Sequence, residues 1–147
     1  MMKTCTINVY KNLFCLFNED QKLVGELLNG FIKKSIKIGK EIYKIKNTGF
    51  FWSDLNIFDK NNQLALRSDA SKNRLVHYSN YTEFYTYKGL SSKKVCLFDN
   101  DDNQVILIDR KENLFSTEYK IEIQKDFNNY LVILSFLYLY IRNSSGE

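Results

Sequence analysis

Residues 130–141 read YLVILSFLYLYI, which is the longest apolar run in the chain and is interrupted only by Ser135. A segment that has neither alternation nor a polar face is typical of a helix enclosed on every side. As a helix, the run would be about 18 Å long, well short of the ~30 Å hydrocarbon core of a bilayer. We therefore expect a buried C-terminal helix, and we do not expect a transmembrane segment.

The ends of this segment also suit a helix when it is counted from Phe127 to Ile141. Arg142 follows directly, where a cation interacts favourably with the C-terminal dipole of a helix. A buried strand is the alternative, because the β-branched and aromatic residues of the run favour sheet. The run is long for a strand, so we expect the helix. Three polar side chains could cap its N-terminus: Asp126, Asn128 and Asn129.

Three pairs of short apolar runs flank polar turns in the preceding part of the chain, which is the sequence pattern of β-hairpins. The turns begin directly after Phe17, Phe58 and Phe98. The separations of 41 and 40 residues between these phenylalanines indicate an internal repeat. Further alternating segments, with one face buried and one in water, lie at residues 36–38, 42–45, 84–87 and 119–123.

The number of repeats favours one architecture over another. A period near 40 residues with several strands is also that of a propeller blade, but three blades are fewer than the roughly four that closure requires. The sequence therefore predicts a mainly β protein, built as a closed or nearly closed antiparallel barrel. The barrel is expected to consist of short strands and to enclose the C-terminal helix.

Composition limits the domain organisation and the partners. The 147 residues include no proline and six glycines, so that no Pro-rich or Gly/Ser-rich linker divides the chain, and residues 1–147 are predicted to form a single domain. An aromatic share of 15% excludes a disordered chain. The 21 basic and 17 acidic residues give a net charge of only +4, so nucleic acid is not an expected partner.

Neither a metal site nor a redox centre is expected. Cys5, Cys15 and Cys96 show no CxxC spacing, and His77 is the one histidine, so a Cys/His zinc site has too few ligands. The cysteines lie in apolar strands, where we expect them to be reduced core residues of a cytoplasmic protein. The N-terminus lacks the apolar run and the cleavage site of a signal peptide. The oxygen-rich segment 99–103 fails the calcium-loop pattern at Gln104 and Arg110, so a polar turn is expected.

Catalysis is not indicated either. The sequence has no P-loop, GxGxxG, GxSxG or HExxH motif. His77 has no evident nucleophile near it in sequence, and a histidine between Val76 and Tyr78 is expected to be a strand residue. We therefore predict a non-enzymatic protein without catalytic residues or cofactors.

Three hairpins with acidic or Asn-containing turns, flanking Tyr-x-Ile strands and a final apolar helix together resemble the tubby-like superfamily. This group includes tubby C-terminal domains, phospholipid scramblases and LURP-one-related proteins. The residues behind the resemblance are 42–45, 58–64, 98–105 and 130–141. It covers nearly the whole chain and implies a barrel of about a dozen strands around a central apolar helix.

The chain departs from this family in three respects. It is short for the fold, so some strands are expected to be abbreviated or the barrel incomplete. Family members usually have a glycine in the strand-turn motif, whereas here Asn62 and Asn103 lie near that position, and Asn tolerates a positive φ. The Pro-rich N-terminal segment and the cysteine cluster of animal scramblases are missing from this sequence. The resemblance therefore does not imply scrambling activity.

A series of lysines is the most suggestive feature for binding: Lys33, Lys34, Lys37, Lys40, Lys44 and Lys46. Only Glu41 opposes it, and isoleucines at 32, 36, 38, 42 and 45 alternate imperfectly with it. Such a pattern could direct several ammonium groups outward from one sheet region and attract anionic lipid head groups. Tubby domains bind phosphoinositides, so the resemblance implies the same class of ligand. A solvated strand face in a lysine-rich chain is the alternative.

The predicted function is a non-enzymatic binding module that associates peripherally with anionic phospholipid head groups through the lysine-rich face. Phe51 and Trp52 are further contact candidates, with core packing as the alternative. The corresponding location is the cytoplasm, at the inner surface of the membrane. A protein-interaction or assembly domain is the alternative function, in which exposed aromatic residues or an unclosed barrel edge meets a protein partner or a second copy.

Overall fold

A computed structural model describes residues 1–48 and 54–144. The described residues form a mainly β protein with one C-terminal α-helix, α1 (Tyr130–Ser144), and a single-turn 3-10 helix, η2 (Ala70–Lys72). The strands are β1 (Met2–Tyr10), β2 (Leu13–Phe17), β3 (Leu23–Asn29), β4 (Lys34–Ile38), β5 (Glu41–Thr48), β6 (Asp54–Phe58), β7 (Leu64–Asp69), β8 (Arg74–Tyr78), β9 (Thr82–Lys88), β10 (Lys94–Phe98), β11 (Gln104–Glu112) and β12 (Thr117–Gln124).

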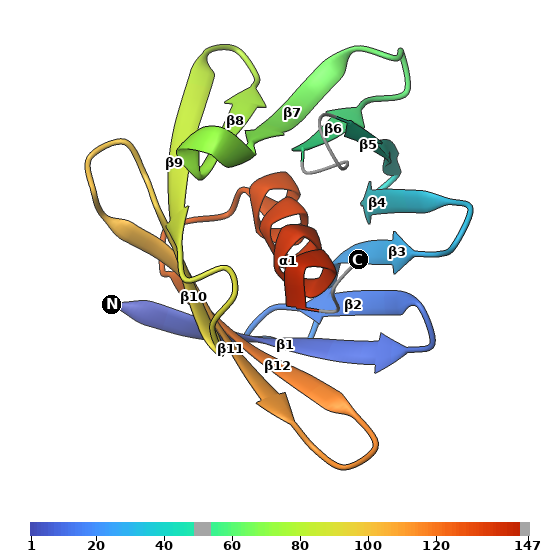
Figure 1. Cartoon of the computed structure of the whole chain (residues 1–147), viewed down its shortest axis with the longest axis vertical. Helices are drawn as coiled ribbons and strands as arrows, with labels where there is room; N and C mark the ends of the chain where they lie inside the picture. The colour runs from blue at the N-terminus through green and yellow to red at the C-terminus, as the bar shows by residue number, and fades with distance from the viewer. Residues whose placement is uncertain (49–53, 145–147) are drawn as a thin grey trace.

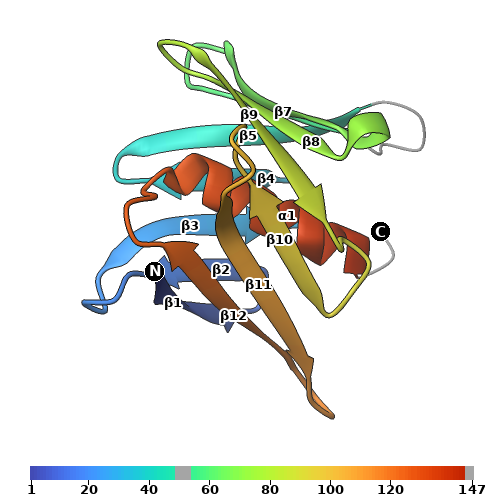
Figure 2. The same ribbon diagram turned by 90° about the vertical axis from the view of Figure 1, so that its left-hand side faces the viewer.

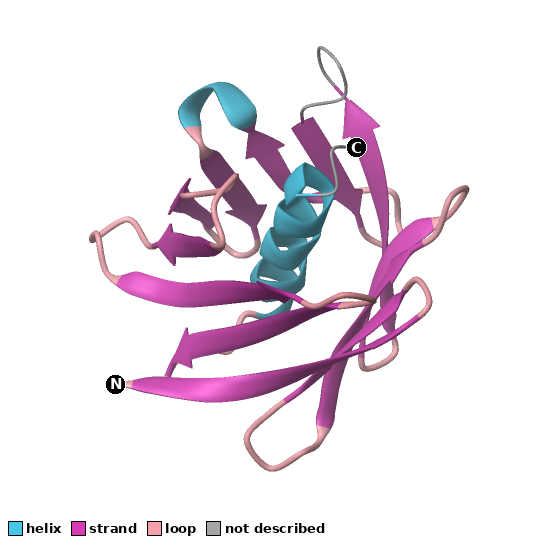
Figure 3. Ribbon diagram, turned by 60° about the horizontal axis from the view of Figure 1, so that its bottom comes forward, coloured by secondary structure: helices cyan, strands magenta, loops and turns pink. Residues whose placement is uncertain are grey.

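Every strand pairs antiparallel with its neighbours in sequence, and β1 pairs with β12, which closes the barrel. The strands surround α1 on all sides (Figures 1 and 3). The predicted barrel around a buried helix is therefore confirmed. All four alternating segments of the sequence are strands or parts of strands, namely β4, β5, β9 and β12.

The internal repeat has a structural cause in the turns after β2, β6 and β10. In each turn the first side chain accepts hydrogen bonds from the backbone N–H groups two and four residues later, and these side chains are Asn18, Asp59 and Asp99. A register shift precedes each turn, at the equivalent Phe17, Phe58 and Phe98. The repeated Phe-Asn/Asp step therefore marks a β-bulge followed by an Asx turn.

The left-handed residue of these turns falls at equivalent positions in all three copies. Positive φ angles occur at Gln21 (61°), Asn62 (59°) and Asp102 (61°). The prediction for Asn62 is confirmed, whereas the expectation for Asn103 is wrong by one residue. Asp102 takes the left-handed conformation instead, which Asp adopts more readily than most residues because its short polar side chain bonds locally.

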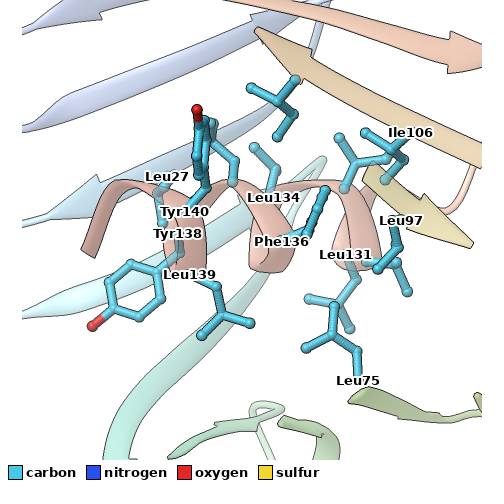
Figure 4. Packing of buried hydrophobic residues seen from close by; sticks show 14 of the residues in the cluster. Leu27, Leu75, Leu97, Ile106, Leu131, Leu134, Phe136, Tyr138, Leu139 and Tyr140 are labelled. Carbon is cyan, nitrogen blue, oxygen red and sulfur yellow. The ribbon is translucent and has the colours of Figure 1, made fainter. Parts of the chain in front are cut away.

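The helix is the centre of the hydrophobic core. Every residue from Leu131 to Ile141 is buried, and Leu27, Leu75, Leu97 and Ile106 point at it from strands around the wall (Figure 4). Helix α1 begins at Tyr130, where the Asn129 side chain accepts a hydrogen bond from the Val132 N–H at 3.2 Å. Of the three predicted caps, Asn129 is therefore the one used.

One glycine in the wall allows the helix to approach closely. A Cβ at Gly25, in β3, would lie 2.6 Å from the Leu134 side chain and 3.4 Å from the Lys37 carbonyl oxygen. Any larger residue at this position must therefore displace the Leu134 side chain, the helix or the wall. The close contact places α1 nearer to β3 and β4 than a side chain on β3 would permit.

The turns between strands lie at two opposite ends of the barrel. Because neighbouring strands are antiparallel, alternate turns lie at opposite ends. Figure 2 shows α1 running between these ends. We call the end at Tyr130, with the three Asx turns, the helix-N end, and the end at Ser144 the helix-C end. The helix-C end comprises the turns at residues 11–12, 30–33, 70–73, 89–93 and 113–116.

Candidate functional site

The structure divides the six predicted lysines among three places. Lys37, Lys44 and Lys46 are exposed on the outer face of β4 and β5, since their strand neighbours Ile36 and Ile45 are buried on the inner face. The Lys46 Nζ lies 5.3 Å from the centre of the Phe58 ring, which is a cation–π contact. Lys37 stands opposite Glu26 on β3. The outer face is therefore basic, and Glu26 balances part of its positive charge.

Lys33 and Lys40 lie at opposite ends of the barrel. Lys33 belongs to the β3–β4 turn at the helix-C end, whereas Lys40 belongs to the β4–β5 turn at the helix-N end. The five residues of β4 separate them by about 17 Å. Lys34 is half-buried, and its Nζ donates a hydrogen bond to the Gly30 carbonyl at 2.8 Å. The six lysines therefore do not form one patch.

A group of exposed apolar side chains marks one sector of the helix-C end. Tyr10, Phe31, Ile32, Leu114 and Phe115 are 70% to 97% exposed, and we call them the apolar rim. They lie on the β1–β2, β3–β4 and β11–β12 hairpins, which are consecutive around the barrel. Large apolar side chains exposed at the tips of neighbouring hairpins are typical of an interaction surface.

Ile32 does not lie where its alternation with the lysines predicts. It was expected among the apolar partners that alternate with the lysines, yet it is 95% exposed at the tip of the β3–β4 hairpin. Ile42 is likewise 48% exposed, on the outer face opposite Lys37. The remaining three, Ile36, Ile38 and Ile45, face the core.

Charge is distributed unequally between the two ends. Among the described turns of the helix-C end there are four lysines, Lys11, Lys33, Lys72 and Lys93, and no acidic residue. The three Asx turns of the helix-N end contain two lysines, Lys22 and Lys60, and six acidic residues: Glu19, Asp20, Asp59, Asp99, Asp101 and Asp102. The same end of the barrel therefore combines the apolar rim with positive charge.

The C-terminus of α1 is tied firmly to this end. The Tyr138 hydroxyl donates to Asn47 Oδ1 at 3.1 Å, and Arg142 donates to the same oxygen. The Tyr140 hydroxyl donates to the Ser92 carbonyl at 2.6 Å. Burial raises the pKa of Tyr140, so this hydroxyl stays protonated and able to donate. These bonds connect the helix to β5 and to the β9–β10 turn at the helix-C end.

The one histidine belongs to a polar cluster at the helix-N end. His77, in β8, has its Nδ1 2.6 Å from Glu83 Oε1, and the Asn129 side-chain amide lies 3.1 Å from the same nitrogen. The Asn129 amide also donates to Glu83 at 3.3 Å. Burial, together with Glu83, raises the pKa of Tyr85 in the adjacent strand. Because Asn129 caps α1, the cluster anchors the helix, and the prediction of a strand histidine is confirmed.

Two of the three cysteines are not core residues. Cys5 is buried, as expected, but Cys15 and Cys96 are half-buried on the outer face of their strands. Their neighbours Leu16 and Leu97 take the inner positions. Burial raises the pKa of all three thiols, which lowers the fraction of reactive thiolate.

The structure adds two observations about metals and membranes. Asp99 engages its own turn, as expected for a polar turn, and no group of three or more His, Cys, Asp or Glu residues in the described part of the chain could bind a metal ion. Among residues 1–48 and 54–144, no helix is both long and apolar enough to cross a bilayer. Phe51 and Trp52, the predicted aromatic contacts, lie outside the described residues.

Comparisons with protein-family models, with curated proteins and with solved structures found no match to this chain.

Proposed function

We propose that the protein is a non-enzymatic module that binds peripherally to anionic phospholipid surfaces through its helix-C end. The observation behind this proposal is the coincidence of the apolar rim with four lysine-containing turns at one end of the barrel. Apolar tips can enter the interfacial region of a bilayer while the surrounding ammonium groups stay at the level of the head groups. The resemblance to tubby domains points to the same ligand class, and membership of that superfamily stays a prediction.

The expected binding free energy requires both the lysines and the apolar rim. A basic residue near an anionic leaflet contributes about 1 kcal/mol, so four lysines supply roughly 4 kcal/mol, which alone corresponds to a dissociation constant near 1 mM. Complete burial of a side chain of the size of Phe or Leu contributes about 1.5–3 kcal/mol. Partial insertion of two hairpin tips therefore brings the affinity into a range where the association is stable and still reversible.

The role proposed for the lysines differs between residues according to their place in the fold. Lys33 stands beside the rim residues Phe31 and Ile32, whereas Lys40 lies at the opposite end. The separation of about 17 Å exceeds the Debye length of about 8 Å at physiological salt. A bilayer in contact with the helix-C end therefore interacts with Lys33 and hardly at all with Lys40.

Charge reversal at these two lysines tests the proposal. We expect Lys33→Glu to weaken co-sedimentation with vesicles of phosphatidylcholine and phosphatidylserine by about 30-fold, since an attraction of about 1 kcal/mol becomes a repulsion of similar size. Lys40→Glu changes the net charge equally and is the matched control, with an expected effect below about twofold. Equal losses for the two variants would show that only net charge matters, and would refute the proposed orientation.

A further inference from the structure

The wall of the barrel is incompletely paired where its first and last strands meet. The ladder between β1 and β12 ends at the pair Thr6↔Lys120. Beyond it β1 runs on to Tyr10 paired with β2, while Thr117 and Glu118 are paired with β11. In Figure 1 the β11–β12 hairpin turns away from β1 in this region. The two strands therefore diverge toward the helix-C end, and we call the space between them the notch.

A cavity occupies the notch. It has a volume of about 590 Å³ and is lined by residues 4–9 of β1 and 116–120 at the β12 side. This volume lies within the range of ligand-binding pockets. One wall is the outer edge of β1, whose backbone N–H and C=O groups toward β12 have no ladder partner after Thr6 among the described residues. Such an edge is a template for another strand.

The notch also exposes side chains that belong to the inner face. Val9 stands opposite Phe14, which is 8% exposed in the core, yet Val9 itself is 45% exposed. Ile7, on the same face of β1, is half-buried. The rings of Phe14 and Tyr119, from strands on either side of β1, meet edge to face at 6.2 Å. The apolar side chains of Ile7 and Val9 are therefore accessible where the ladder is missing.

Nothing in the sequence of this edge protects it from pairing. Natural edges are commonly blocked by Lys, by Pro or by an inward-pointing charge. The unpaired residues 7–10 read INVY and contain no charge and no proline. The lining of the cavity carries one acidic and one basic side chain, Glu118 and Lys120, so its charges balance. The notch accordingly suits an extended segment that is close to neutral.

We propose that the notch binds an extended peptide segment of a partner protein, added as a strand to the edge of β1. The segment is alternately apolar and polar, with its apolar side chains on Ile7 and Val9 and its polar side chains in solvent. In this mode of recognition the main-chain hydrogen bonds supply affinity and the alternate side chains supply specificity. This is a second binding activity, with a ligand of a different class from the lipid proposed above, and Tyr10 is the residue common to the notch edge and the apolar rim.

A peptide that copies residues 116–123, STEYKIEI, is the probe. These residues already pair with β1 at Thr6 and Cys5 in the closed part of the barrel, so the probe has the required alternation. The controls are two forms of the same peptide, one N-methylated at the odd-numbered amides and the other at the even-numbered amides. N-methylation removes the N–H hydrogen-bond donors on one edge of the peptide strand and keeps all side chains. We expect saturable binding in calorimetry for the parent peptide, and at least tenfold weaker binding for the methylated form whose blocked amides face β1.

A protein variant provides the second arm of the test. Val9→Lys places a charge in the notch at an already exposed position, and we expect it to weaken peptide binding at least tenfold without loss of folding. Thr86→Lys, at an exposed position of β9 that is paired with both β8 and β10, is the matched control and is expected to bind normally. Absence of binding by the parent peptide, equal binding by all methylated forms or an unchanged affinity of Val9→Lys would each overturn the proposal. No lipid is present, so these results are separate from those with vesicles.

Discussion

Leu134→Lys is expected to abolish folding. Leu134 is fully buried at the middle of α1 and contacts the wall at Gly25, so that a lysine there can neither reach water nor find a partner. Burial of an unpaired charge costs several kcal/mol, and loss of the leucine adds the cost of lost packing. The sum is at least about 4 kcal/mol against a total stability of about 5–15 kcal/mol.

Soluble yield, near-ultraviolet circular dichroism and urea unfolding measure this effect. The matched control is Leu114→Lys, because Leu114 is 88% exposed and the substitution should change the free energy of unfolding by no more than about 0.5 kcal/mol. A Leu134→Lys protein that unfolds cooperatively with near-native stability would be incompatible with a helix buried inside the barrel.

Removal of four of the five side chains of the apolar rim is expected to have the largest effect on membrane association. A variant with Phe31, Ile32, Leu114 and Phe115 all replaced by serine keeps every lysine and loses the insertion energy. Even about 1 kcal/mol per side chain, less than the value for full burial, predicts a loss above 100-fold in partitioning to acidic vesicles. Unfolding in urea should be little changed, because these side chains are exposed in the free protein.

Exposed apolar residues at the other end supply the control for this variant. Tyr81 is 69% exposed in the β8–β9 turn at the helix-N end, and Leu64 is 36% exposed beside an Asx turn. We expect Tyr81→Ser with Leu64→Ser to leave vesicle binding unchanged. Unaltered binding of the rim variant would limit the interaction to electrostatics and would remove the proposed insertion.

The turns and the helix could be predicted from the sequence because their signals are local. An Asx turn depends on one side chain and the backbone four residues ahead of it, so Asp59 and Asp99 mark hairpins without knowledge of the rest of the chain. The run of residues 130–141 has no polar face in any conformation, which left only an enclosed position. Three similar units are too few for a propeller, and this count favoured a closed or nearly closed barrel.

The candidate site could not be predicted in the same way, because it depends on which ends of strands meet. Lys33 and Lys40 are seven residues apart in sequence, and one short strand places them at opposite ends. Ile32 alternates with lysines in the sequence, and only the position of the turns shows that Phe31-Ile32 and Leu114-Phe115 lie at hairpin tips. The one signal of an exposed tip in the sequence is that Ile32 lies next to Lys33.

The notch depends on information of still longer range. Residues 7–10 belong to a strand like the others, and their missing partner on the β12 side is a property of how far β1 and β12 overlap after the whole barrel has closed. That overlap reflects the divergence of the β11–β12 hairpin and leaves no mark in the sequence of either strand. Alternation alone would assign Val9 to the core, and the exposure of Val9 is the clearest structural sign of the notch.

The most direct test of the proposed function is a measurement of which end of the barrel touches the lipid. An environment-sensitive fluorophore is attached at Phe115→Cys or at Tyr81→Cys, with Cys15 and Cys96 replaced by serine, and quenching by nitroxide-labelled lipid is recorded on acidic and neutral vesicles. The account predicts strong quenching at position 115 and little at position 81, on acidic vesicles only. Equal quenching at the two positions, or none at 115, would contradict it.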